Sequence, residues 1–295
     1  MLGTTYCERC TQGITSGPEP LKIQYKDYAA WHNKLLQDEE KTGKARAFWE
    51  NYLSGTMPVL NLPYDRSGSL GSSGSAAYQW GIDEQLSESL RNLAITTHSS
   101  LFMILLAGFN LLLSQICGQK DILMAIPASA RQHEALKNVM GMFVNTLVVR
   151  TSVESSQTFA DFFRDFKEKL FQVLEYQHHP MELIFSQLKI KYPRIAVFFN
   201  MVNLGNSSPR DHSDFHPLHS EQVQDTKFDL HCYLTEYDGG IIISCHYFKN
   251  RFLAGTIEKI AHLYIKILEN ISAQPGIKIK AYDFKGKRKV LKHQE

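Results

Sequence analysis

The stretch GMFVNTLVVR at residues 141–150 decides how the fold of this chain is understood. Its apolar residues are typical of a β-strand, but Asn145 and Thr146 interrupt them. Side chains alternate along a strand, so one face would carry Phe143, Asn145, Leu147 and Val149, and the other Val144, Thr146, Val148 and Arg150. A buried amide without hydrogen-bond partners costs roughly 1–3 kcal/mol. We therefore expect a neighbouring loop, a water molecule or a substrate to hydrogen-bond Asn145.

The composition around this strand is that of an ordinary globular protein. Of 295 residues, 43% are hydrophobic and 21% are charged, and the net charge is only +2. So small a charge gives no argument for binding nucleic acid or an anionic membrane. The longest apolar run, residues 101–113, is shorter than the roughly 20 residues that span a bilayer, and residues 1–17 lack the apolar segment of a signal peptide. We expect a cytoplasmic protein whose five cysteines remain thiols.

Helical and strand patterns follow one another along the chain. Apolar residues at helical spacing predict helices after Asp83, over residues 101–117, after Thr158 and over residues 253–271, with Asp83, Ser99 or Ser100, and Thr158 as N-caps. Alternating or continuous apolar runs predict strands at residues 77–82, 122–126, 195–202, 228–235 and 241–247. The turn at residues 238–240 joins the last two as a hairpin. Together these elements predict an α/β fold with a mixed β-sheet flanked by helices.

Residues 25–53 form a longer helical pattern, interrupted by a charged stretch that is either a solvated face or a break at Gly43. Its candidate core contacts are Tyr28, Trp31, Leu35, Phe48, Tyr52 and Leu53.

Several residues invite a metal or redox interpretation that the surrounding sequence does not favour. Cys7 and Cys10 form a CxxC without a second ligand pair or a preceding strand. His178 and His179 precede Pro180 and should point in divergent directions, so a metal site with Glu182 is not favoured. Three further histidines fall in a polar loop at irregular spacing, where solvation is the simpler interpretation; these are His212, His216 and His219. The sequence predicts no metal site.

Ser129 and Arg131 follow the buried strand at residues 122–126. Loops at the carboxyl ends of buried strands are where α/β proteins place binding groups. This segment is therefore either a structural turn or the wall of a cleft.

Five motifs, in order, resemble condensation domains of non-ribosomal peptide synthetases. QYKDYAAW at residues 24–31 resembles the Q-Y-x-D-Y-A-x-W signature, and residues 118–131 resemble G-Q-x-D-I … P-x-x-G-R with Ala130 in place of glycine. Residues 141–150 resemble G-x-F-V-N-T-x-x-x-R. YQHHPME at residues 176–182 resembles H-Q-D-Y-P-F-E but departs from it at Tyr176, His178, His179 and Met181, and KFDL at residues 227–230 resembles a late K-F-D-L element. The resemblance covers about residues 20–284.

The resemblance implies a chloramphenicol-acetyltransferase-like lobe, one of two that enclose a substrate tunnel. In such domains an acceptor amine attacks a donor thioester and an amide forms, with both substrates tethered through phosphopantetheine on carrier proteins. The family's catalytic HHxxxDG is not in this sequence, because the double histidine at residues 178–179 is followed by Leu183 and Ile184 at the DG positions. We expect residues 21–284 to be the carboxyl-terminal lobe, residues 1–20 a poorly ordered remnant of the first lobe, and residues 285–295 a basic linker.

The resemblance also implies roles for individual residues. Ser129, Arg131, Asn145 and Thr146 would face the tunnel, where Ser129 could help to stabilise an oxyanion and Asn145 could bind substrate or fix the pocket wall. Structural motif positions would be Tyr25, Asp27, Trp31, Asp121, Gly141, Phe143, Arg150, Pro180, Glu182, Phe228 and Asp229. No catalytic residue and no cofactor bound by the chain itself are implied.

Three functional hypotheses follow. The first is a carboxyl-terminal part of a condensation domain, a fragment or a truncated product, that is inactive without the HHxxxDG lobe; its partners would be carrier domains, adjacent synthetase domains and the missing lobe. The second is a stand-alone interaction lobe that docks with a carrier protein or a separately encoded first lobe. The third is an acyltransferase that uses His98, His178 or His179. Under the first two hypotheses, the chain should expose an apolar patch where its partner packs. The substrates, and the choice between condensation, cyclisation and epimerisation, are left open.

Overall fold

The computed structural model describes residues 21–67, 74–129, 131, 133–189, 193–202, 227–237 and 240–282. Several sequence predictions lie outside these residues: the remnant at residues 1–20 with Cys7 and Cys10, Ala130, the loop histidines His212, His216 and His219, part of the hairpin turn at residues 238–239, and the linker at residues 285–295.

A six-stranded mixed sheet forms the centre of the fold, as the sequence predicted. Its strands are β1 (Ser75–Ile82), β2 (Asp121–Ser129), β3 (Val144–Ser152), β4 (Val197–Val202), β5 (Leu230–Tyr237) and β6 (Gly240–Phe248). They lie in the order β1-β6-β5-β4-β2-β3. The pairs β2–β4 and β4–β5 are parallel and the others antiparallel. The predicted hairpin is the antiparallel pair β5–β6.

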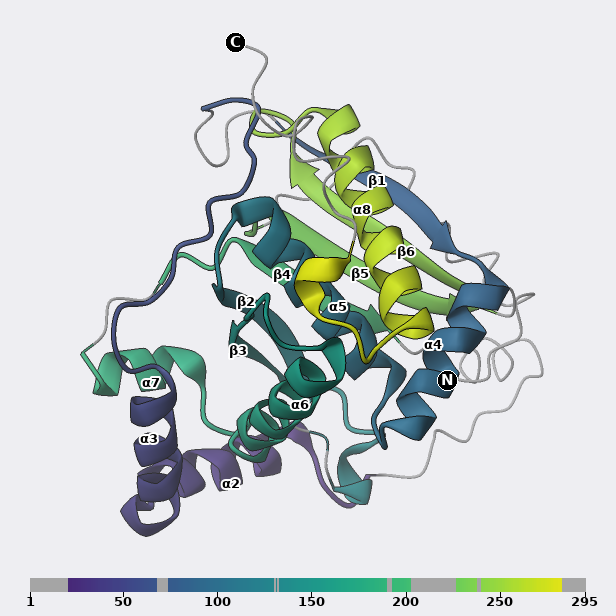
Figure 1. The fold of residues 1–295 in the computed structure, drawn as a ribbon. Helices are drawn as coiled ribbons and strands as arrows, with labels where there is room; N and C mark the ends of the chain where they lie inside the picture. The colour runs from purple at the N-terminus through teal and green to yellow at the C-terminus, as the bar shows by residue number, and fades with distance from the viewer. Residues whose placement is uncertain are drawn as a thin grey trace, which may run out of the picture.

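The helices are α2 (Tyr25–Gln37), α3 (Glu39–Tyr52), α4 (Glu84–Thr96), α5 (Leu101–Cys117), α6 (Phe159–Glu175), α7 (Met181–Gln187) and α8 (Ala254–Ala273). Helix α5 packs directly against α8, and α4 contacts both (Figure 1). Residues 103–113 of α5 are buried all round, as an apolar helix in a core must be. Helices α2, α3 and α7 lie together at the β3 end of the molecule (Figure 1).

The predicted N-caps are confirmed. The Asp83 carboxylate accepts a hydrogen bond from the Leu86 amide at 2.8 Å. Of the two candidates before α5, Ser100 is the cap, and its hydroxyl accepts from the Met103 amide. The Thr158 hydroxyl accepts from the amide of Asp161 at the start of α6. These short-range signals place the helix starts correctly because capping depends on neighbouring residues alone.

The prediction for residues 25–53 was partly wrong. The helix breaks at Asp38, whose backbone is extended, while Gly43 lies within α3. Trp31, predicted to be a core contact, is 52% exposed. The reason is that α2 buries its residue Tyr28 in a small separate cluster with Leu136, Val139 and Phe143. So small a cluster buries only a narrow strip of the helix.

The opening strand also begins later than predicted. Strand β3 starts at Val144, so Phe143 precedes the sheet and belongs to the small cluster under α2. In the middle of β3, Leu147, Val148 and Val149 are all buried, so both faces of the sheet are covered there.

Within the described residues, no single helix is long and apolar enough to cross a membrane. Helices α4 and α5 pass that test only as a pair bent by 105°.

Candidate functional site

A cavity of about 350 Å³ lies where α2, the start of β3 and the turn between α6 and α7 meet. Three of the motifs, far apart in the sequence, supply its walls. Its lining residues are Tyr25, Tyr28, Ala29, His32, Asn33, Met142, Phe143, Val144, Asn145, Thr146, Gln177, His178, Pro180 and Glu182. This volume is at the lower end of the roughly 300–1,000 Å³ typical of ligand pockets.

Asn145 finds its hydrogen-bond partners in the turn between α6 and α7. Its Nδ2 donates to the carbonyl oxygen of Gln177 at 2.8 Å and to that of His179 at 3.1 Å. The intervening carbonyl, that of His178, accepts from Nε2 of His32 on α2 at 2.7 Å. Three successive carbonyls are thus held by two side chains. The neighbouring loop, one of the partners expected from the sequence, is therefore bound by Asn145, which fixes this wall of the cavity.

Tyr25 explains why residue 141 is a glycine. The Tyr25 hydroxyl donates to the Met142 carbonyl at 3.0 Å, which lays its ring against the backbone of Gly141. A β-carbon at Gly141 would overlap the Tyr25 ring. The Phe143 ring then packs 5.3 Å from the Tyr25 ring and 4.6 Å from the Tyr28 ring, centroid to centroid. Aromatic packing therefore joins the first motif to the strand motif.

Ser129 and Arg131 lie outside the lining of this cavity. The Arg131 guanidinium donates to the carbonyls of Leu136 and Val139, both at 2.6 Å, and stacks 4.1 Å from the Phe143 ring centre. The Ser129 hydroxyl accepts a hydrogen bond of 3.4 Å from the Arg131 amide. Arg131 therefore organises the loop before β3. Of the four predicted tunnel residues, Asn145 and Thr146 line the cavity.

Two motif positions form an ion pair at the edge of the sheet. Arg150 contacts the carboxylate of Asp121 with Nη2 at 2.7 Å and Nε at 3.1 Å. Its guanidinium also donates to the carbonyls of Ser54 and Thr56. The hydrogen bond with Asp121 raises the pKa of Arg150. This pair joins β2 and β3 to the segment after α3, which is a structural role.

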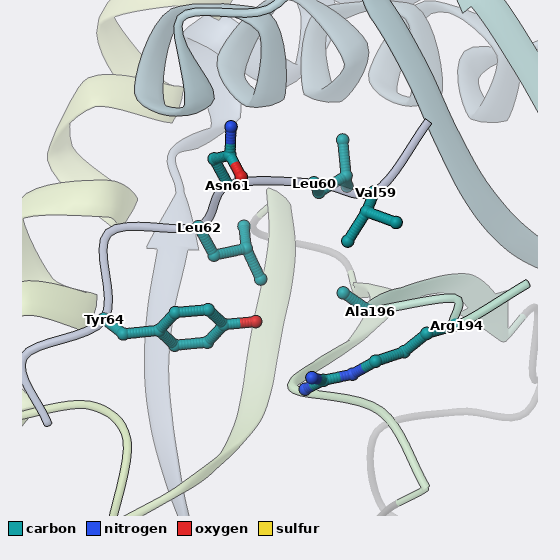
Figure 2. A pocket seen from close by; sticks show the side chains of 7 residues that line it. All are labelled: Val59, Leu60, Asn61, Leu62, Tyr64, Arg194 and Ala196. Carbon is teal, nitrogen blue, oxygen red and sulfur yellow. The ribbon is translucent and has the colours of Figure 1, made fainter. Parts of the chain in front are cut away.

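The carboxylate of Asp229 is 1% exposed and has three partners. Arg194 and Arg251 pair with it at 2.7 and 2.8 Å, and the Tyr64 hydroxyl donates to it at 3.1 Å. Burial and the nearby Asp229 charge raise the pKa of Tyr64 to about 12. Tyr64 and Arg194 point toward one another from different segments beside a smaller cavity of about 240 Å³ (Figure 2). The adjacent motif residue, Phe228, packs its ring 4.9 Å from that of Phe198.

The remaining motif residues have local roles. The Asp27 carboxylate accepts from the Gln24 amide at 2.9 Å in a capping box at the start of α2. Pro180 is the N-cap of α7 and Glu182 lies in its first turn. The ring of the exposed Trp31 lies edge-on to that of His178, 6.2 Å away.

Among the described residues, the histidines do not gather into a metal-binding group. His179 is 3% exposed, and its Nε2 lies 3.3 Å from Gln187 Oε1. Burial lowers the pKa of both His178 and His179. Of these two and the exposed His98, His178 lines the cavity. In the part of the chain that the structure describes, no three His, Cys, Asp or Glu side chains form a metal site.

The sequence interpretation missed His32. Its ring stacks on Tyr28, with centroids 5.6 Å apart and planes inclined by 12°. The signal that was available is spacing, because residues four apart lie on one face of a helix. The partner of its Nε2 lies 146 residues away, so no local pattern could have found it.

Comparison with known proteins identifies the family. Residues 4–289 match the family described as Condensation domain. This chain belongs to the condensation domain family. In non-ribosomal peptide synthetases, this family forms amide bonds.

The sequence of this condensation domain resembles those of peptide synthetases. It is 32% identical over 268 residues to tyrocidine synthase 3 of Brevibacillus parabrevis, covering 88% of this chain. It is 34% identical over 263 residues to bacitracin synthase 3 of Bacillus licheniformis, covering 87% of this chain. In both cases the match spans only 4% of the relative's length.

The fold of this condensation domain is also found in solved structures. The X-domain in its complex with OxyB from teicoplanin biosynthesis superposes with a TM-score of 0.77 at 21% identity. The match covers 90% of this chain and 62% of that one. The condensation domain of the Monacolin K polyketide synthase MokA superposes with a TM-score of 0.72 at 15% identity, so the mixed sheet flanked by helices is the condensation-domain fold.

Proposed function

We propose that this chain is the carboxyl-terminal part of an amide-forming condensation domain and that it is inactive without a part carrying HHxxxDG. Its substrates are an acyl or peptidyl thioester and an acceptor amine, each tethered through phosphopantetheine to a carrier protein. The observation that carries the proposal is the convergence of three family motifs on one cavity in a sequence that lacks HHxxxDG. The chain also spans only 62% of the solved X-domain chain.

The two predicted tunnel residues that line the cavity provide a wall for substrate but no acid–base chemistry. Asn145 and Thr146 are neutral, and Asn145 uses both of its N–H groups on backbone carbonyls. It therefore has no donor left for an oxyanion, and Ser129, the other residue proposed for that role, lies outside the lining of this cavity. Attack by an amine also needs a group that accepts a proton, and such a group contributes about 10²–10⁴ in rate. The missing histidine supplies that group in our proposal.

The test is reconstitution. The chain is mixed with, or fused to, a segment that carries HHxxxDG and is encoded in the same reading frame. The masses of the carrier-bound products are then measured by mass spectrometry. We expect an amide from the combined protein and none from the chain alone. Failure of the combined protein to form amides with any pair of carrier-bound substrates in a broad panel would refute the proposal.

A second candidate, a stand-alone interaction lobe, is favoured by exposed apolar side chains at the rim of the cavity and next to it. Met140, Met142 and Val144 are 75%, 73% and 58% exposed. Apolar patches of this kind often mark partner surfaces. This function predicts a stable one-to-one complex with a carrier protein or a separate lobe, without amide formation. A monomer by light scattering in the presence of both would exclude it.

A further inference from the structure

We propose that the cavity between α2, β3 and α7 binds the acceptor substrate by its amine, as a primary ammonium group held by Glu182, the Asn145 amide oxygen and the Tyr25 and Tyr28 rings. The inference rests on the proposed function and specifies which of the two substrates this cavity takes.

The charge of the lining favours a cation. Among the described residues that line the cavity, Glu182 contributes a carboxylate, and no lysine or arginine is present. Burial and the nearby His32 keep the pKa of His178 below its usual value, so this imidazole stays neutral at physiological pH. His32 commits Nε2 to the His178 carbonyl. Arg131 lies outside the lining, against the Phe143 ring. The lining therefore holds one carboxylate and no lysine or arginine to oppose a bound cation.

The orientation of the Asn145 amide provides a hydrogen-bond acceptor. Carbonyl oxygens can only accept, so the atom that faces those of Gln177 and His179 must be Nδ2. This leaves Oδ1 as the polar atom for a ligand, and within the described residues it makes no hydrogen bond. An ammonium or amine N–H satisfies such an atom. A thioester carbonyl, which is itself an acceptor, would be repelled by it.

The aromatic wall adds a second attraction for a cation. The Tyr25 and Tyr28 rings lie 6.0 Å apart, and both line the cavity. The face of an aromatic ring attracts an ammonium group placed within about 6 Å of its centre. Burial raises the pKa of Tyr28, so its ring stays a neutral phenol at physiological pH. Carboxylate, amide oxygen and aromatic rings thus favour the same ligand chemistry.

Binding of small probes to the intact chain tests this assignment. A panel of amino acid amides (glycinamide, alaninamide, leucinamide and phenylalaninamide) is titrated by NMR, alongside their N-acetyl derivatives, which carry no positive charge. We expect saturable binding of at least one free amine, with shifts at Asn145 and residues 177–182, and at least about tenfold weaker binding of its N-acetyl derivative. Equal affinity of the acetylated probes, or no binding of any amine, would overturn the assignment.

Two matched substitutions test the carboxylate. Glu182→Gln keeps the shape of an exposed side chain and removes its charge, and we expect it to weaken amine binding about tenfold. Glu168→Gln makes the same change at an exposed position of α6 outside the cavity and should leave binding unchanged. Equal affinity of Glu182→Gln and the unmodified chain would refute the role of Glu182.

The reconstituted domain separates this inference from the proposed function. If it forms amides, Glu182→Gln should raise KM for the aminoacyl carrier and leave KM for the acyl carrier unchanged. The reverse pattern would refute the amine assignment while the proposed function stands. If no amide forms but the free amines bind as expected, the proposed function fails and the amine site stands.

Discussion

Replacing Asn145 by alanine tests whether one side chain holds the cavity wall. The substitution removes the hydrogen bonds to the carbonyls of Gln177 and His179. Each such bond contributes about 0.5–1.5 kcal/mol net, so we expect a loss of roughly 1–3 kcal/mol in the free energy of unfolding. Since His32 still holds the carbonyl between them, the turn should loosen without the domain unfolding.

Urea unfolding measures the loss of stability, and amide hydrogen exchange at residues 177–180 locates it. Asn33→Ala is the matched control, because Asn33 lines the same cavity from an exposed position on α2. It should change stability by less than about 0.5 kcal/mol. If Asn145→Ala were as stable as the control and exchange at the turn did not increase, Asn145 would not hold this wall.

Three further predictions concern other parts of the fold. Burial, with a smaller effect of nearby His246, lowers the pKa of His231 to about 4. Because an unfolded histidine titrates near about 6.5, the unfolded state binds more protons between these values. Stability should therefore fall as the pH drops from about 6.5 toward 4, and less steeply in His231→Gln; equal slopes in pH-dependent urea unfolding would contradict this. Asp229→Asn leaves Arg194 and Arg251 without their shared carboxylate and should lower the free energy of unfolding in urea by about 3 kcal/mol. A loss no larger than that of the exposed Asp165→Asn would be evidence against this ion-pair cluster. Gly141→Ala should lower the free energy of unfolding by about 1–3 kcal/mol, because the added β-carbon meets the Tyr25 ring. Gly43→Ala, in open space within α3, should raise it by about 0.5–1 kcal/mol. A change of the same sign for both variants in thermal unfolding would be inconsistent with this packing.

The fold was largely predictable because its signals are local. Caps such as Asp83, Ser100 and Thr158 accept hydrogen bonds from amides three residues away, and the alternation in β5 and β6 follows from one buried face. The break at Asp38 and the exposure of Trp31 were not predicted. Both depend on α2 packing against a small cluster, which a periodic pattern within the helix cannot reveal.

The site was predictable only in part, because its contacts join residues that are far apart in the sequence. The polar Asn145 in an apolar strand signalled that a partner was needed, but the partner lies 32 and 34 residues away in the turn before α7. Arg131 also contacts carbonyls later in its own loop, which the motif alone does not show. The residue types indicated that Asn145 and Arg131 need hydrogen-bond partners, and the tertiary structure determines which partners they have.

The most direct test of the central claim is the amount of amide formed on the acceptor carrier in a single turnover, measured by intact-protein mass spectrometry. Our account predicts no product above the uncatalysed background for this chain alone. It predicts product at least about 10² times faster once the chain is joined to a segment carrying HHxxxDG. Amide formation by the unaided chain at the rate of the joined protein would contradict it.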